Sequence, residues 1–237
     1  LRHHPWRNAA AVVAVMLGVA LAFSVQLINA SALSEFSSAV RSVDGQPDLA
    51  LHAAQGTFDD ALFARVAHDP QVSVASPVLE LETYVIAADG KRVPLRVVGI
   101  DALVVAAVAP ALLPVPQAGA DRLSTLAPAT VFLNPAARRA LETGIGKVPA
   151  SLQLQSGLAL HTVRVAGSVS AGGAPLAVMD IAAAQELFGK LGKLSRIDMR
   201  LRTGVDRATF IRLLPLPTGI SASEPGDAGQ RADNLSR

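Results

Sequence analysis

The hydrophobic and polar positions divide the chain into one long apolar stretch and a longer part in which short apolar runs alternate with polar turns. Residues 9–34 carry no charged side chain, and Ala9 to Ala30 are mostly Ala, Val, Leu and Phe. A helix of these 22 residues is ~33 Å long, enough to cross a hydrocarbon core of ~30 Å. The pattern therefore predicts one membrane-spanning helix within residues 1–35.

The flanks of this stretch predict its orientation. Arg2, Arg7 and two histidines precede it, whereas the first charge beyond it is the acidic Glu35. Basic residues favour the cytoplasmic side, and Trp6 lies where an interfacial aromatic anchor is expected. We therefore expect a cytoplasmic N-terminus and an exterior location for the residues after the span.

A cleavable secretory signal is the alternative, because residues 30–32 read Ala-Ser-Ala, a small-x-small pattern. The apolar stretch is longer than the ~7–15 residues of a signal's hydrophobic region, which favours the membrane helix. Gln26 and Asn29, in the outer half of the span, either contact a neighbouring span or mark the approach to the interface. Whether the stretch is a membrane helix or a cleaved signal, the residues after it lie beyond the membrane.

The exterior part repeats a unit made of a short apolar strand, a capping residue and a short helix that ends at Gly or Pro. The strands and their caps are Leu49–His52 with Thr57, Thr130–Leu133 with Asn134, and Leu176–Met179 with Asp180. The fourth unit is a strand over Arg196–Leu201 and a helix over Val205–Leu214. After Asp180, one helical face carries Ile181, Ala184, Leu187 and Phe188, and Gly189 ends the helix.

Other segments predict strands without helices. These are Val72–Ala75, Val78–Ala87, Arg92–Ile100, Leu152–Leu154 and His161–Val169, with tight turns at Asp89–Gly90 and Ser156–Gly157. Three prolines between Ala109 and Gly119 predict a linker. We take this linker as a boundary between two lobes.

The predicted fold is α+β, with one N-terminal transmembrane helix followed by a two-lobed extracytoplasmic domain of βαβ-type units. Residues 1–35 form the cytoplasmic collar and the span. Residues 36–100 together with 196–226 form a discontinuous lobe, and residues 101–195 form a lobe inserted into it. Residues 227–237 lead toward a second transmembrane helix.

Composition and motifs exclude several kinds of chemistry. The chain has 21 basic and 19 acidic residues without a basic tract, so nucleic acid is not an expected partner. It has no cysteine, which excludes disulfides and thiolate metal sites within it. Gly144–Lys147 lacks the spacing and the hydroxyl of a phosphate-binding loop, and the five histidines lack zinc-site spacing.

The remaining candidates are better explained without catalysis. Gly167–Gly172 has the wrong spacing for a nucleophile elbow and is expected to be a turn. Asp59 and Asp60 fit a helix first turn, and Glu80 and Glu82 fit the solvent face of a strand. We therefore predict no catalytic, cofactor-binding or metal-binding residue, no cofactor, and no enzymatic activity.

The arrangement resembles the first part of an ABC-transporter permease of the FtsX-like and MacB-like superfamily. The stretches that carry the resemblance are Pro5–Asn8 leading into Val12–Phe23, Thr130–Asn134, Val163–Val169, Pro175–Gln185 and Ile197–Leu201. The last two are similar to the family's strand, Asp-capped Ala-Gln helix and following alternating strand. The resemblance covers nearly the whole chain.

The resemblance implies a permease subunit of the bacterial inner membrane that works with a cytoplasmic ABC ATPase and with a second permease or the second half of the same permease. ATP hydrolysis would move the outer domain to transport or extract a lipoprotein, lipid or peptide, or to signal across the membrane to a periplasmic partner. The resemblance also implies that the discontinuous lobe is porter-like, similar to the porter lobes of efflux pumps. Membrane lipid surrounds the span.

Two other classes stay open. A single-pass, membrane-anchored periplasmic adaptor would share the topology, and further apolar spans after Arg237 would separate it from a permease. A membrane-tethered enzyme would require a catalytic constellation that the sequence does not show.

Overall fold

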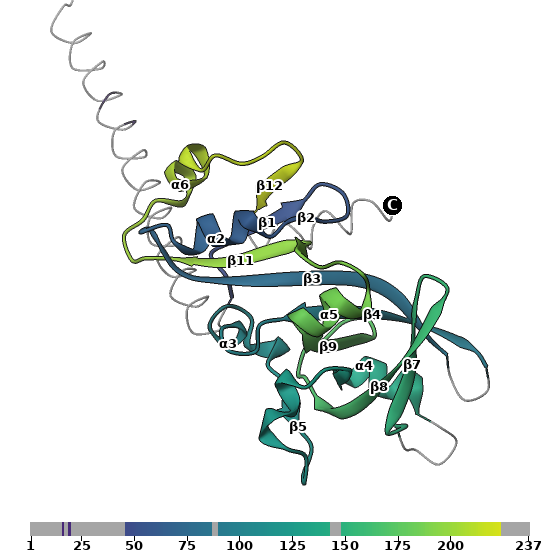
Figure 1. Ribbon diagram of the computed structural model, residues 1–237. Coiled ribbons are helices and arrows are strands. Elements are labelled where there is room, and N and C mark those ends of the chain that lie inside the picture. The colour runs from purple at the N-terminus through teal and green to yellow at the C-terminus, as the bar shows by residue number, and fades with distance from the viewer. Residues whose placement is uncertain (1–15, 17–18, 20–45, 87–89, 143–147, 224–237) are drawn as a thin grey trace, which may run out of the picture. The chain divides into compact units, whose positions relative to one another are not determined.

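The computed structural model describes residues 16, 19, 46–86, 90–142 and 148–223 (Figure 1). The chain separates into two units, residues 1–44 and residues 45–237, and the fold described below is that of the second. Of the predicted span only Met16 and Val19 are described; both are helical and exposed. No helix within the described ranges is long and apolar enough to cross a membrane. The rest of the predicted span, and residues 227–237, lie outside these ranges.

The second unit mixes strands and short helices, as the sequence predicts. Its strands are β1 (Leu49–Ala53), β2 (Phe58–Asp59), β3 (Val72–Ile86), β4 (Arg92–Ile100), β5 (Val115–Pro116), β6 (Thr130–Leu133), β7 (Ser151–Ser156), β8 (Ala159–Ser168), β9 (Leu176–Asp180), β10 (Lys193–Leu194), β11 (Arg196–Leu201) and β12 (Ile220–Ser223). Its helices are α2 (Ala61–Ala67), α3 (Val105–Val108), α4 (Pro135–Leu141), α5 (Ile181–Leu187) and α6 (Arg207–Leu213), with 3-10 turns η1 (Pro110–Leu112) and η2 (Arg122–Leu126).

One sheet of ten strands contains a closed ring. Its order is β12-β1-β11-β3-β4-β9-β6-β8-β5, and β7 pairs with both β3 and β8. The pairings from β3 through β4, β9, β6, β8 and β7 therefore return to β3. The β3–β7 seam is short, with Val85 opposite Leu154 and Ile86 opposite Gln153. From the first half of β3, β11, β1 and β12 continue as an open sheet.

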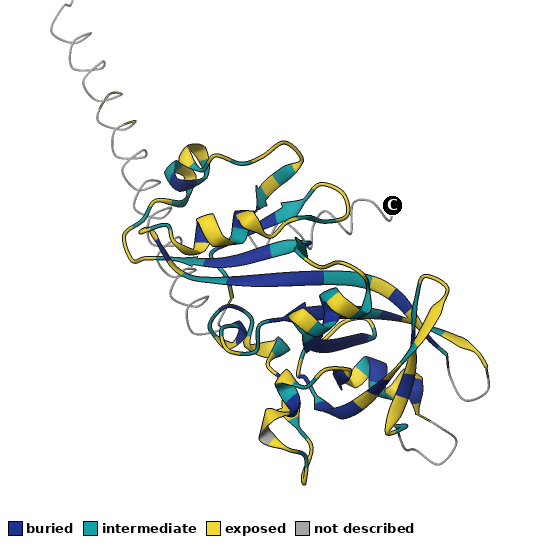
Figure 2. Cartoon of the chain, viewed as in Figure 1, coloured by how far each residue is buried: buried dark blue, intermediate teal, exposed yellow. Residues whose placement is uncertain are grey.

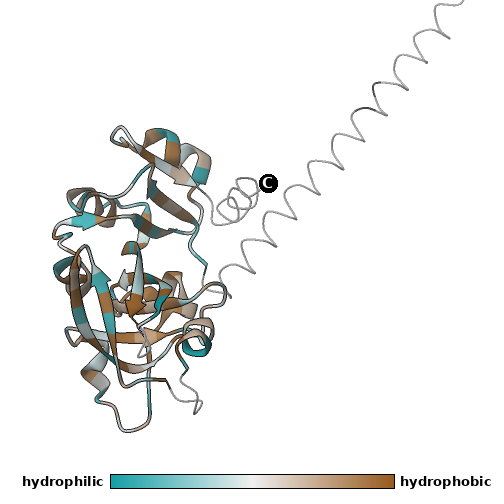
Figure 3. Cartoon of the chain, turned by 90° about the vertical axis from the view of Figure 1, so that its right-hand side faces the viewer, coloured by the Kyte–Doolittle hydropathy of each residue, from teal (hydrophilic) through white to brown (hydrophobic). Residues whose placement is uncertain are grey.

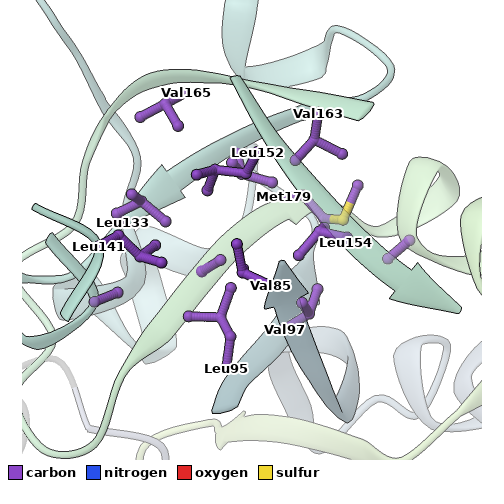
Figure 4. Close-up of a cluster of buried hydrophobic side chains, with 14 of the residues drawn as sticks. Val85, Leu95, Val97, Leu133, Leu141, Leu152, Leu154, Val163, Val165 and Met179 are labelled. Atoms are coloured by element: carbon purple, nitrogen blue, oxygen red, sulfur yellow. The ribbon is translucent and has the colours of Figure 1, made fainter. Parts of the chain in front are cut away.

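Hydrophobic residues lie mainly along the strands (Figure 3) and collect in three cores. All six strands of the ring contribute to the first core (Figure 4), which includes Val85, Leu95, Leu133, Leu154, Val163 and Met179. The second core packs α2 and α6 against β1 and β11. The third core packs α3 against β3 and β4 on the other face of the sheet. The predicted division into two lobes stays a prediction; the first core contains residues from both.

Local signals in the sequence predict several elements correctly. The Asn134 side chain caps α4 by accepting from the Ala137 N–H at 2.8 Å, and Asp180 caps α5 by accepting from the Ala182 and Ala183 N–H groups. Gly189 ends the α5 segment with φ +61°, where a side chain would be strained. The strands over Thr130–Leu133, Arg92–Ile100 and Arg196–Leu201 have the predicted bounds.

The two strands predicted on either side of Pro77 are a single strand, β3. Pro77 lies opposite Ile197 of β11, at a pair whose peptide groups point away from that neighbour. On its other side β4 ends at Ile100, which lies opposite Val78. No ladder hydrogen bond is lost at Pro77, so the strand continues through it.

Two further expectations were wrong. Ala109–Gly119 is not a linker, because it contains η1 and β5, and β5 pairs with β8. Gly167 permits this pairing, since a Cβ there would lie 2.1 Å from the Val115 carbonyl oxygen. Thr57 is not a helix cap, because the following residues form β2, which pairs with β10. The predicted helix end at Gly144 lies outside the described residues.

Asn134 is expected to be the most sensitive of the helix caps. It is fully buried, accepts from the N–H groups of Ala137 and Leu176, and donates through Nδ2 to the Ala174 carbonyl at 2.9 Å. Replacing Asn134 by Ala leaves the buried N–H groups of Ala137 and Leu176 without partners, so we expect a loss of about 2–4 kcal/mol in the free energy of unfolding. Urea denaturation followed by circular dichroism measures this loss.

Asp180→Ala is the matched control for this measurement. It removes a cap at the start of α5 that is only half-buried, and should cost about 1 kcal/mol. Equal losses in the two variants would mean that the Asn134 network contributes no more than an ordinary cap.

Candidate functional site

Three charged residues lie together where β11 pairs with β3. Arg196 and Asp198 are two residues apart on β11, and Glu80 is on β3, two residues beyond Val78, the partner of Arg196. The Arg196 Nε lies 2.8 Å from the Asp198 Oδ1, and the guanidinium also pairs with the Glu80 carboxylate. We call these three residues the β3–β11 charge cluster.

The charge cluster is largely withdrawn from solvent. The side chain of Asp198 is 5% exposed, that of Arg196 19% and that of Glu80 30%. Burial raises the pKa of the Asp198 carboxyl, although the neighbouring Arg196 charge opposes this shift. Burial also disfavours the Arg196 cation, but the charges of Asp198 and Glu80 outweigh it and raise its pKa. The opposite charges of Arg196 and Asp198 therefore each offset part of the cost of burying the other.

Neighbouring side chains fix the backbone around the cluster. The Ser195 Oγ accepts from the Glu80 N–H at 2.7 Å and donates to the Val78 carbonyl. His52 of β1 lies opposite Arg196, and the buried Ser76 of β3 lies opposite Asp198. The cluster thus connects β3 to the open part of the sheet, but it offers no nucleophile paired with a general base.

The described residues line at least two grooves at the surface. A groove of about 560 Å³ lies between β5, the end of β8 and α4, and its walls include Val115, Pro135, Arg138 and Arg139. Another, of about 480 Å³, lies between α2 and the residues before β12. Across the described part of the chain, His, Asp and Glu side chains form no group of three that could hold a metal ion.

The residues that the sequence analysis weighed for chemistry are scattered. His52, His68 and His161 lie in β1, at the end of α2 and in β8. Gly167 and Ser168 end β8, and the rest of the Gly167–Gly172 segment follows this strand. The segment 144–147 falls outside the described residues. The candidates that the structure does describe lie apart from one another.

Two interpretations of acidic residues were wrong. Glu80 is not simply on the solvent face of a strand, because it pairs with Arg196 from a half-buried position. Asp59 belongs to β2 rather than to a helix first turn. Its Oδ1 accepts from the Ala61 N–H, and the Lys193 Nζ lies 3.4 Å from its Oδ2. These contacts, the backbone hydrogen bond foremost, lower the pKa of the Asp59 carboxyl.

Sequence reasoning missed the charge cluster, although one signal was available. Arg196 and Asp198 alternate with Ile197 and Met199 in a predicted strand, so both charges share one face. The third member, Glu80, is far away in sequence, and only the pairing of β3 with β11 brings it close.

No protein-family model matches the chain, and no curated protein matches it. Solved structures of other proteins are similar to it in fold. The periplasmic region of MacB from Actinobacillus actinomycetemcomitans is 9% identical, with 78% of this chain and 92% of that chain covered and a TM-score of 0.55. The extracellular domain of the noncanonic ABC-type transporter YknZ from Gram-positive bacteria is 11% identical, with 74% and 99% covered and a TM-score of 0.55.

These likenesses concern the fold. The chain shares the mixed α/β fold of the periplasmic and extracellular domains of MacB and YknZ. This is the fold that the resemblance to FtsX-like and MacB-like permeases implies, and that expectation is confirmed.

The charge cluster predicts a pH-dependent defect when its cation is removed. Arg196→Met leaves the buried Asp198 carboxylate and the half-buried Glu80 carboxylate without their cation, so we expect a loss of about 3–5 kcal/mol in unfolding free energy near neutral pH. The folded-state pKa of Asp198, already raised above its ordinary 3.8 by burial, rises further in this variant. A carboxyl with a raised folded pKa contributes stability at low pH that is lost as pH rises through that pKa. The defect should therefore shrink in denaturant titrations as the pH is lowered from neutrality toward the ordinary carboxyl pKa of 3.8.

Lys193→Met provides the matched control. It removes the cation of the exposed Lys193–Asp59 pair, so it should change stability little and without this pH dependence. The double variant Arg196→Met with Asp198→Leu should recover part of the loss. A defect of Arg196→Met that is the same at every pH would contradict the assigned cause.

Proposed function

We propose that the chain supplies the first transmembrane helix and the extracytoplasmic domain of an ABC-transporter permease. Its place is the bacterial inner membrane, with the N-terminus in the cytoplasm and residues 46–223 outside. The observation that carries the proposal is the fold shared with extracytoplasmic domains of two ABC-type transporters, joined to the apolar, basic-flanked segment at residues 9–30.

The position of the two ends of the fold supports a domain inserted between two membrane spans. β1 begins at Leu49 and β12 ends at Ser223. The two strands pair antiparallel, with Ala50 opposite Ser223. The chain therefore enters and leaves the fold at neighbouring points, as a domain that is tethered to a membrane by both of its ends requires.

The sheet provides a mechanical connection from these tethers to the closed ring. β1 pairs with β11, and β11 pairs with β3, where the Arg196–Glu80 ion pair of the charge cluster joins the two strands. β3 then belongs to the ring. A displacement of the membrane helix would pull on β1 and would reach the ring through strands joined side by side by hydrogen bonds.

The proposed partners follow from this role. A cytoplasmic ABC ATPase supplies the energy, since the chain carries no phosphate-binding loop of the required spacing. A second permease, or the second half of the same permease, completes the membrane part. The moving outer domain acts on a lipoprotein, a lipid or a peptide, or transmits a signal to a periplasmic partner. The chain itself carries out no catalysis.

Cysteine labelling tests the topology, because the 237 residues contain no cysteine. Leu191 is 71% exposed in the folded unit. In spheroplasts, Leu191→Cys should react with a membrane-impermeant maleimide, whereas Arg2→Cys should react only after the membrane is permeabilised. Ala177→Cys, at a fully buried position, is the control for unfolded protein and should not react in either state.

Labelling of Arg2→Cys in intact spheroplasts would overturn the orientation. Purification of the full-length protein from its own membrane tests the function separately. An associated ABC ATPase whose hydrolysis depends on the chain supports the permease, and a chain that purifies without any ATPase favours the single-pass adaptor.

A further inference from the structure

One side of the β7–β8 hairpin (Figure 1) is an open sheet edge. β8 pairs with β7 from Ala159 to Arg164, and on its other side it pairs with β6 only from Arg164 onward. Residues 159–163 therefore have no strand beside them on the β6 side, within the parts of the chain that the structure describes.

The hydrogen-bond directions along β8 identify the groups on this edge. The Val165 N–H donates to the Ala150 carbonyl, before β7, and the Arg164 N–H donates to the Ala129 carbonyl, before β6. Peptide groups alternate in direction along a regular strand, so Val163 and His161 also point toward β7. Leu160 and Thr162 consequently present their N–H and C=O groups to the open side.

This edge lacks the features that usually prevent strands from pairing. Proteins protect edges with charged residues, prolines, bulges or very short strands. β5, at one end of the sheet, has two residues, one of them Pro116, and β12, at the other, has four. Ser156 to Val163 carries no Lys, Arg, Asp, Glu or Pro, and its pairing with β7 is regular.

The side chains at this edge are apolar and exposed. Leu158 at the hairpin turn is fully exposed and Leu160 is 54% exposed. Figure 2 shows much of this hairpin in the colour of exposed residues. Tyr84 of β3 lies on the same outer face as Leu160, with Gln155 of β7 between them, since cross-strand partners share a face. Tyr84 is 46% exposed, so the apolar surface continues inward from the edge.

We propose that this edge pairs with the same edge of a second copy of the chain, β8 against β8 in antiparallel orientation. The segment carries no like charges that would repel across a two-fold axis. The open stretch is bounded by its own turn at one end and by the start of β6 at the other. A two-fold axis places each turn beside the other copy's β6, so the two stretches match in length. The proposal does not depend on a transport function.

Backbone groups select one register for this pairing. Each copy presents two outward residues, Leu160 and Thr162. The outward N–H and C=O groups of both residues in both copies form hydrogen bonds only when Leu160 of one copy faces Thr162 of the other. This register gives four hydrogen bonds between the copies and places the two-fold axis at His161. The two His161 residues then form a non-hydrogen-bonded pair, in which Cα atoms are ~4.5 Å apart. The two Leu160 residues are diagonal, ~7–8 Å apart.

Disulfide crosslinking of the full-length protein in its membrane tests this register. Disulfides require Cα atoms about 4.4–6.8 Å apart. His161→Cys should therefore give a crosslinked dimer on mild oxidation, read on a non-reducing gel. Leu160→Cys and Thr162→Cys should each stay monomeric, and the double variant carrying both should crosslink.

Proline substitutions separate the edge pairing from the fold. Thr162→Pro in the His161→Cys background removes an outward N–H and an exposed hydroxyl that accepts from the Gln153 Nε2, but no N–H that points to β7. The thermal unfolding midpoint should therefore stay close to that of the parent while the crosslink is lost. Val163→Pro removes an N–H that points to β7 and should lower the midpoint.

Two results would overturn the proposal. One is the absence of a crosslink in folded His161→Cys, which would leave the edge to a strand of another protein or to none. The other is equal crosslinking of Leu160→Cys and His161→Cys, which would indicate random collision or a different register.

Discussion

The double use of β3 is the constraint on which the rest of the structure depends. A strand has two hydrogen-bonding edges, and β3, with 15 residues, is long enough to pair with different strands along its length. Its first half pairs with β11 and begins the open sheet, and its last residues pair with β7 and close the ring. β4 lies along most of its other side. Any change in the register of β3 would therefore alter the open sheet and the ring together.

The β3–β11 charge cluster bears on that register. Side chains alternate between the faces of a sheet, so a slip of one residue would exchange Ile197 and Met199 with Arg196 and Asp198. The two apolar residues would leave the core beneath α2 and α6, and the charges would enter it without partners. Buried ion pairs contribute little net stability compared with apolar packing. The cluster acts here by making the wrong register costly.

The parts of the fold that could be predicted are those that depend on residues close together in the sequence. Asn134 and Asp180 each satisfy N–H groups two or three residues away, so their side chains alone indicate a helix start. β2 and β5 could not be predicted, because each is two residues long and exists only through a distant partner. The continuity of β3 through Pro77 depends likewise on where β4 ends. The Glu80–Arg196 pair joins residues more than a hundred positions apart, so no local pattern contains it.

The same distinction explains how a fold can be shared with extracytoplasmic domains that have few identical residues. Strand pairing uses backbone groups that every residue except proline possesses, and the cores require apolar side chains of suitable volume rather than particular ones. Gly167 and Gly99 are two positions where identity matters, since a Cβ would meet the Val115 carbonyl at 2.1 Å or the Ala184 Cβ at 2.7 Å. Such positions fix geometry, not chemistry.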